Sequence, residues 1–179
     1  RGFIYKHFKQ MKDKIQILLG DITKLKVDAI VNAANTSLLG GGGVDGAIHR
    51  AAGPELLEFN RKLGGCKTGE AKISPGFNLP AKFIIHTVGP VWNGGNNNED
   101  KLLANCYNNS LKLAVENKIR TIAFPAISTG VYSFPLERAA KIAAAEVKIF
   151  LEKKDSVEKI IFVCFSEHDY SVYQNVLNK

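Results

Sequence analysis

The sequence predicts an α/β protein whose central sheet is largely parallel and buried between helices. Short apolar runs rich in β-branched residues alternate along the chain with longer segments of helical periodicity. This alternation is typical of parallel strands joined by helical crossovers. The chain has 179 residues, of which 45% are hydrophobic and 23% charged, and this size and composition suit one domain with one core. We therefore expect a single domain over residues 11–179.

Periodicity assigns the individual elements in chain order. The expected strands are 15–19, 29–32, 71–74, 83–88, 121–124 and 159–165. The expected helices are 44–52, 54–63, 100–117, 135–153 and 169–178. In the helix 135–153, apolar side chains recur at steps of three and four residues and predict a buried stripe: Leu136, Ala140, Ala143, Val147 and Phe150. Residues 1–10 precede Met11, and we predict that they form a leader outside the domain.

The cysteines, the apolar runs and the net charge exclude several classes of protein. Cys66, Cys106 and Cys164 are odd in number and lack metal-ligand spacing, so we expect no disulfide framework, no metal site and no cofactor. No apolar run approaches the roughly 20 residues that cross a bilayer, and we expect a cytoplasmic protein without a membrane partner. The formal net charge of +7 favours an anionic partner, which includes RNA and equally a nucleotide diphosphate. Because the lysines are scattered, RNA is only weakly supported.

Four consecutive glycines, Gly40 to Gly43, separate the second expected strand from the next helix. Such a run costs folding entropy, which indicates a backbone that turns tightly or approaches a ligand closely. A glycine loop before a helix presents free N–H groups and the positive end of the helix dipole, and both suit a phosphate. Gly41, Gly43 and Gly46 match the dinucleotide motif G-x-G-x-x-G, but a polar segment separates them from the strand. The alternative is a flexible surface loop.

Polar side chains flank the glycine loop. Asp45 and His49 are four residues apart and share one face of the expected helix. Asp45 would position or deprotonate a water, although a carboxylate in a first helical turn can also serve only as a cap. A lone helical histidine such as His49 is more often structural. Asn32 and Asn35 follow the strand, where an amide either completes a turn or holds ribose hydroxyls or an ordered water.

Two further strand ends carry unusual loops. The segment from Ser128 to Val131, before a proline-initiated helix, predicts a second backbone cradle for a phosphate, and two cradles suggest a diphosphate. Tyr132 would pack on a sugar ring or, alternatively, fill the core. Asp21 and Ile22 follow the first strand, where they would contact a purine or simply start a turn. Ligands of open α/β sheets bind beyond the carboxyl ends of strands, so we expect these loops to meet.

Together these motifs resemble the macrodomain family, most closely its MacroD-type ADP-ribose hydrolases, which include bacterial O-acetyl-ADP-ribose deacetylases. The resemblance covers residues 13–178. It rests on GDIT at 20–23, NAAN at 32–35, GGGGVDGAIH at 40–49 and STGVY at 128–132, with CKTGEA at 66–71, HTVGP at 86–90 and FPAI at 124–127. It implies a three-layer α/β/α sandwich with a mixed central sheet of six or seven strands.

The resemblance also implies a role for each site residue. Asp21 and Ile22 would hold the adenine, with Phe165 beside it. The diphosphate would be wrapped by backbone from both loops, namely Gly43, Val44, Ser128, Thr129, Gly130 and Val131. The distal ribose would lie among Asn35, Asp45 and Tyr132. The candidate catalytic residues are Asp45, Asn35, Asn32 and His49.

The implied activity is hydrolysis of ADP-ribose derivatives without a metal. The substrates would be O-acetyl-ADP-ribose, which loses acetate, and mono-ADP-ribosylated proteins, which lose ADP-ribose from Asp or Glu. An unperturbed aspartate has a pKa of about 3.9 and is a weak base, so either Asp45 or a substrate phosphate would take the proton from the attacking water. The alternative function is an ADP-ribose-binding reader that does not cleave its ligand.

Overall fold

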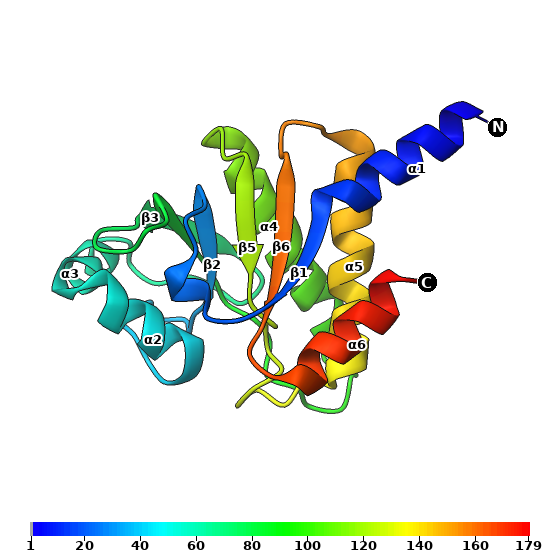
Figure 1. Cartoon of the computed structure of the whole chain (residues 1–179). Coiled ribbons are helices and arrows are strands. Elements are labelled where there is room, and N and C mark those ends of the chain that lie inside the picture. The colour runs from blue at the N-terminus through cyan, green and yellow to red at the C-terminus, as the bar shows by residue number, and fades with distance from the viewer. Residues whose placement is uncertain (1) are drawn as a thin grey trace.

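A mixed sheet of six strands forms the centre of the computed structural model, which describes residues 2–179 (Figure 1). The strands are β1 (Ile15–Leu19), β2 (Ala29–Ala33), β3 (Ala71–Pro75), β4 (Phe83–Thr87), β5 (Thr121–Phe124) and β6 (Lys159–Cys164), in the spatial order β1-β6-β5-β2-β4-β3. All neighbours pair in parallel except β3 and β4. The short connection between β3 and β4 reverses the chain, because only antiparallel neighbours can be joined so briefly. The α/β class and the mixed sheet are confirmed.

Helices cover both faces of the sheet and complete the three layers (Figure 1). They are α1 (Gly2–Lys14), α2 (Gly43–Ala52), α3 (Pro54–Arg61), α4 (Glu99–Glu116), α5 (Leu136–Lys153) and α6 (Glu167–Leu177), with a short 3-10 helix, η1, at Ile22–Lys24. Leu103 of α4, Ala140 of α5 and Tyr173 of α6 belong to one hydrophobic core. Ile48 of α2 and Leu56 of α3 belong to a second core on the opposite face.

The strands supply both cores by alternating their side chains. In β2, Ala29 and Val31 pack with α4, α5 and α6, whereas Ile30 between them packs with α2 and α3. In β6, Phe162 faces the first core and Ile161 the second. Because successive side chains of a strand point to opposite faces, a strand covered on both sides is apolar throughout. This explains why inner strands such as β2 and β6 appear in the sequence as apolar runs, whereas the edge strand β3 also contains polar residues.

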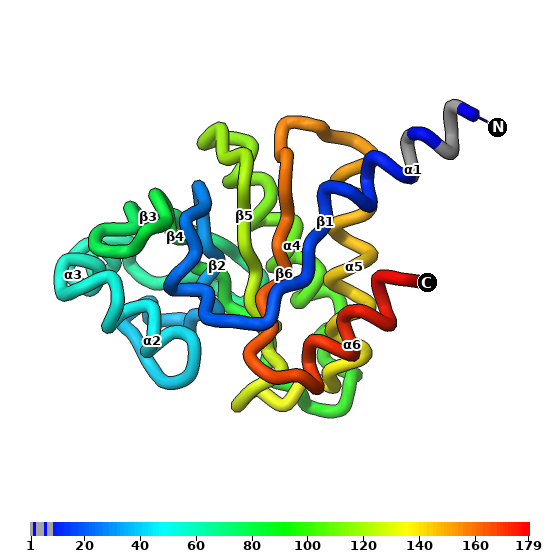
Figure 2. The backbone as a smooth tube through the Cα atoms, in the orientation of Figure 1, coloured from blue at the N-terminus to red at the C-terminus, as the bar shows by residue number. Residues whose placement is uncertain are grey.

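The opening segment is helical in the part that the structure describes. Helix α1 crosses the boundary that we expected at Met11 and leads directly into β1 (Figure 2). Met11 is only 7% exposed and joins the core beneath α4, α5 and α6. Within residues 2–179, no helix combines the length and the apolar character needed to cross a membrane.

Candidate functional site

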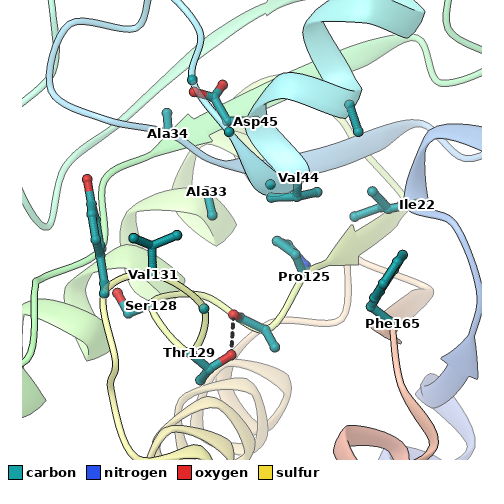
Figure 3. Close-up of a pocket in the computed structure, with 18 of the residues that line it drawn as sticks. Ile22, Ala33, Ala34, Val44, Asp45, Pro125, Ser128, Thr129, Val131 and Phe165 are labelled. Carbon is teal, nitrogen blue, oxygen red and sulfur yellow. Dashed lines mark hydrogen bonds between the residues drawn. The ribbon is translucent and has the colours of Figure 1, made fainter.

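A cleft of about 740 Å³ opens at the carboxyl ends of the parallel strands (Figure 3). It is bounded by the loop after β1, the loop between β2 and α2, and the loop between β5 and α5, with Phe165 directly after β6. The three loops that we expected to meet therefore do so. The volume lies within the range of about 300–1,000 Å³ that is usual for small-molecule sites.

Every residue that we predicted to bind substrate lines this cleft: Asp21, Ile22, Asn35, Gly43, Val44, Asp45, Ser128, Thr129, Gly130, Val131, Tyr132 and Phe165. Of the candidate catalytic residues, Asn35 and Asp45 line the cleft. Asn32 and His49 instead lie behind Asp45, where each approaches the carboxylate. Any contribution of these two to chemistry would act through Asp45, and the roles of all the site residues remain predictions.

The glycine loop is held in a defined conformation. Gly40 and Gly43 have φ of 89° and 57°, a left-handed region that side chains with a Cβ rarely adopt. The Asn35 Nδ2 atom donates to the Gly40 carbonyl at 2.8 Å, so the amide at the strand end completes this turn. Helix α2 begins at Gly43, and its N-cap Gly42 has no side chain to cap it. The first N–H groups of α2 therefore remain available to an anion in the cleft.

The loop between β5 and α5 is organised by its own backbone. Ser128 has a φ of 65°, and its carbonyl accepts a hydrogen bond from Phe134 N at 2.9 Å. The Thr129 hydroxyl donates to the Ala126 carbonyl at 2.8 Å (Figure 3). Gly89 of a neighbouring loop packs so closely against Ser128 that a Cβ there would collide with the serine side chain. The loop is therefore fixed in shape without a ligand.

A cluster of aromatic and charged side chains anchors the same loop to the helices behind it. Trp92 N donates to the Tyr132 carbonyl at 2.8 Å, and the Trp92 ring lies 4.8 Å from the Phe134 ring. Arg138 stacks over Trp92 at 5.0 Å and binds both carboxylate oxygens of Asp100 at 2.8 and 2.7 Å. This arrangement joins α4 and α5 to the backbone of Tyr132.

The opposite end of the cleft combines a carboxylate with an exposed ring. Asp21 caps η1, since its Oδ1 accepts from the N and the hydroxyl of Thr23 at 2.9 and 2.7 Å. These bonds, the hydroxyl foremost, lower the pKa of the Asp21 carboxyl. The turn role that we left open is thus present, while the carboxylate still faces the cleft. Phe165 was expected within the last strand, but β6 ends at Cys164 and the Phe165 side chain is 91% exposed.

Asp45 is the buried carboxylate of the site, with only 5% of its surface exposed. Its Oδ1 accepts from Asn32 Nδ2 at 2.8 Å and lies 3.5 Å from His49 Nε2. Its Oδ2 lies beside Gly41, where an added Cβ would come within 3.1 Å of that oxygen and 3.3 Å of Asn35 Nδ2. Burial raises the pKa of the Asp45 carboxyl, although the Asn32 hydrogen bond and His49 oppose the shift. Asp45 is therefore a stronger base than the unperturbed aspartate considered from sequence.

The structure adds residues that the sequence interpretation did not select. Arg50 of α2 and Asp169 of α6 also line the cleft. His86 and Ser74 are fully or almost fully buried behind Asn32. The signal for His86 was a histidine directly after the apolar run 83–85, whereas Ser74 lies in the mixed strand AKISP and had no comparable signal. The three cysteines are buried and free. Across residues 2–179, no group of three or more His, Cys, Asp or Glu side chains could hold a metal ion.

The fold and the cleft together define an α/β/α domain with a ligand site at the carboxyl edge of its sheet. The Macro domain model matches residues 31–143, and the chain belongs to this family. A macro domain-containing protein of Chlorobaculum tepidum is 66% identical, over 91% of this chain and 95% of its own length. The ADP-ribose glycohydrolase MACROD2 of Xenopus laevis is 58% identical over 93% of this chain, which spans 40% of that protein.

Solved structures agree with this assignment. A variant of the Oceanobacillus iheyensis macrodomain, determined with ADPR, superimposes with a TM-score of 0.89 at 49% identity. The match covers 94% of each chain. The Trypanosoma brucei macrodomain in complex with ADP-ribose gives a TM-score of 0.86 at 46% identity, over 90% of this chain and 68% of that one.

Proposed function

We propose that this macrodomain binds ADP-ribose in the cleft and hydrolyses ester bonds at the distal ribose. The observation that carries the proposal is Asp45, a buried carboxylate with a raised pKa at the end of a cleft bounded by two backbone cradles. The similarity to an ADP-ribose glycohydrolase and to macrodomains solved with ADP-ribose supports the choice of ligand.

The proposed ligand follows the length of the cleft. The adenine would lie between Ile22 and the exposed Phe165 ring, with the Asp21 carboxylate accepting from the exocyclic amine. The diphosphate would lie between the start of α2 and the loop from Ser128 to Val131, where backbone N–H groups and the helix dipole favour negative charge.

The distal ribose would then lie against Asn35, Asp45 and Tyr132. Tyr132 is partly exposed at the cleft, which suits contact with a sugar ring. The bond to be cleaved thus comes next to the free Oδ2 of Asp45.

The proposed reaction consumes one water and yields a carboxylic acid and free ADP-ribose. Water, oriented by Asn35 and Asp45, loses a proton either to Asp45 or to a phosphate oxygen of the substrate as its oxygen bonds to carbon. The attacked atom is either the ester carbonyl carbon, which expels the ribose oxygen as a hydroxyl after it takes up the proton lost by water, or, for an ester on the anomeric carbon, that carbon itself, which expels the carboxylate. The raised pKa of the Asp45 carboxyl favours its use as the base. The substrates are O-acetyl-ADP-ribose and proteins mono-ADP-ribosylated on Asp or Glu.

Hydrolysis in ¹⁸O-water distinguishes the two positions of attack. Attack on the carbonyl carbon introduces the label into the released acetate or protein carboxylate. Attack on the anomeric carbon leaves that carboxylate unlabelled. Mass spectrometry of the carboxylate product is the measurement, because a free anomeric hydroxyl exchanges its oxygen with water and would blur the second readout.

The decisive experiment offers the protein both substrates separately, with calorimetry against ADP-ribose in parallel. Release of acetate or of unmodified protein is the expected result. ADP-ribose binding without release of either product would make the chain a reader module. Calorimetry with single-stranded RNA at two salt concentrations tests the remaining alternative, because electrostatic binding weakens steeply with salt.

A further inference from the structure

A row of buried polar side chains lies behind Asp45 and crosses the sheet to its edge. It consists of Ser74 in β3, His86 in β4, Asn32 in β2 and Asp45 in α2. Ser74 is 2% exposed, and both His86 and Asn32 are 0% exposed. None of these three is a lining residue of the cleft, so they reach a ligand only through Asp45. Buried polar groups are costly unless they are hydrogen-bonded, and this row therefore needs an explanation.

Strand register brings the row together. The parallel pairing of β2 with β4 places Asn32 opposite His86. The antiparallel pairing of β3 with β4 places Ser74 opposite Ile84, one diagonal step from His86 on the same face. Asn32 Nδ2 lies 3.1 Å from His86 Nδ1, and His86 Nε2 lies 2.9 Å from Ser74 Oγ. With the bond from Asn32 to Asp45 at 2.8 Å, the row is continuous.

The positions of the hydrogens in this row follow from the Asp45 carboxylate, which is the acceptor at the cleft end of the row. An ionised carboxylate only accepts, so the Asn32 amide must direct its NH₂ group towards Asp45 Oδ1. The second hydrogen of that NH₂ then points to His86 Nδ1, which must carry a lone pair. The His86 proton consequently resides on Nε2 and is donated to Ser74 Oγ. Ser74 in turn donates its own hydroxyl proton to the Pro75 carbonyl at 3.1 Å.

We propose that His86 and Ser74 are positioning residues, which fix the Asn32 amide so that it holds Asp45 Oδ1 and leaves Oδ2 free for the ligand. A flipped amide would set the Asn32 oxygen against two acceptors, the carboxylate and the unprotonated ring nitrogen. Asn32 Oδ1 is buried without a hydrogen-bond partner, so the two donated bonds alone select the amide orientation. The catalytic consequence rests on the proposed hydrolysis, whereas the structural arrangement does not.

The row also supports Asp45 without bringing a positive charge to it. Burial, and to a lesser extent His49, lowers the pKa of His86 to about 3, so the ring is neutral at physiological pH. His49 is the titratable group whose charge acts on both His86 and Asp45. Lys72 lies opposite His86 in the register, but its ammonium donates to the Leu63 carbonyl at 2.6 Å. The neutral amide orients the carboxylate, and although its hydrogen bond lowers the pKa of Asp45, burial still keeps that pKa raised.

The test compares variants that keep or remove the two hydrogen bonds of the His86 ring, the one accepted from Asn32 and the one donated to Ser74. His86→Gln retains an acceptor and a donor, whereas His86→Leu retains neither. Ser74→Ala removes only the terminal acceptor and is the milder variant if His86→Leu fails to fold. Ser110→Ala is the matched control, because it removes another buried serine hydroxyl, one without a hydrogen-bond partner, in α4. The readouts are ring-nitrogen NMR of His86, a carbon NMR titration of the Asp45 carboxyl without ligand, and kcat and KM.

In the unmodified protein we expect the His86 proton on Nε2. In His86→Leu the pKa of Asp45 should rise, because its fixed donor is lost, and kcat should fall by about tenfold, as for one lost hydrogen bond. KM should change by less than about threefold. His86→Gln should recover most of both effects, Ser74→Ala should show smaller shifts in the same directions, and Ser110→Ala should show none.

A proton on Nδ1, an unchanged Asp45 pKa in His86→Leu, or a His86→Gln variant no better than His86→Leu would each overturn the proposal. If the unmodified protein hydrolyses neither substrate, the proposed function fails, but both NMR measurements still decide whether the row positions Asp45. The two proposals therefore fail separately.

Discussion

Replacement of Asp45 by asparagine is the most direct perturbation of the site. The amide oxygen of the new side chain can accept from Asn32 as Oδ1 does now at 2.8 Å, so the packing around the position is retained. What is lost is the negative charge and the ability to take a proton. We expect kcat to fall by about 10²- to 10⁴-fold, the usual contribution of a positioned acid or base. This loss corresponds to about 3–5 kcal/mol of activation free energy.

The same variant has a predictable effect on stability. Burial raises the pKa of Asp45 in the folded protein above its unfolded value, so the ionised form is disfavoured by folding. That penalty is fully present above the folded pKa and disappears as the pH falls towards the unfolded pKa. Asp45→Asn should therefore melt at a higher temperature than the unmodified protein at neutral pH. The difference should shrink as the pH is lowered.

The assays are product release from O-acetyl-ADP-ribose, calorimetry with ADP-ribose, and thermal melting at neutral and acidic pH. ADP-ribose affinity should stay within a few-fold, and Asp45→Ala should lose turnover similarly. Full turnover in Asp45→Asn would refute the assignment of Asp45. A lower melting temperature at neutral pH would show that the carboxylate is structural, and not a functional group kept at a cost to stability.

Three further perturbations test other parts of the cleft. Gly41→Ala should reduce turnover at least about tenfold with little change in melting temperature, because the new Cβ would crowd Asp45 Oδ2 at 3.1 Å. Unchanged kinetics would refute this role of the Gly41 position. Phe165→Ala should weaken ADP-ribose binding by about tenfold, the scale of one stacked base, without altering melting since the ring is 91% exposed; unchanged calorimetry would exclude stacking. EDTA should leave turnover intact, because the proposed hydrolysis uses the Asp45 carboxylate and no metal; activity lost and then restored by a metal ion would contradict this.

Local patterns predicted most of the fold because most of its elements are locally encoded. Every strand was located within a few residues, and the inner strands were the clearest because strands covered on both faces are apolar runs. Helix α1 was not predicted as part of the fold. Residues 1–10 were set aside as a leader because they precede Met11, and the first turn of α1 carries no acidic residue that would mark a helix start. Met11 is buried because distant parts of the chain cover it.

The site was predictable where it consists of loop backbone and not where it depends on register. The glycine run and the segment from Ser128 to Val131 could be recognised as candidate phosphate-binding loops from their composition alone. In contrast, nothing local in the sequence pairs Asn32 with His86, which lie 54 positions apart, or brings Ser74 beside that ring. Only the strand order β2-β4-β3 does so. Asn32 and His49 could be selected from sequence, but their position behind Asp45 could not.

The two sides of the cleft, the start of α2 and the loop between β5 and α5, pack into hydrophobic cores on opposite faces of the sheet. Val44 and Ile48 of α2 pack into the core shared with α3, whereas Ile127 and Phe134 of the opposing loop pack into the core shared with α4, α5 and α6. A diphosphate that contacts both loops would act as a non-covalent crosslink between two hydrophobic cores that lie on opposite faces of the sheet. Ligand binding should then slow amide hydrogen exchange in α2 and α5 together, so that the layers open as one cooperative unit.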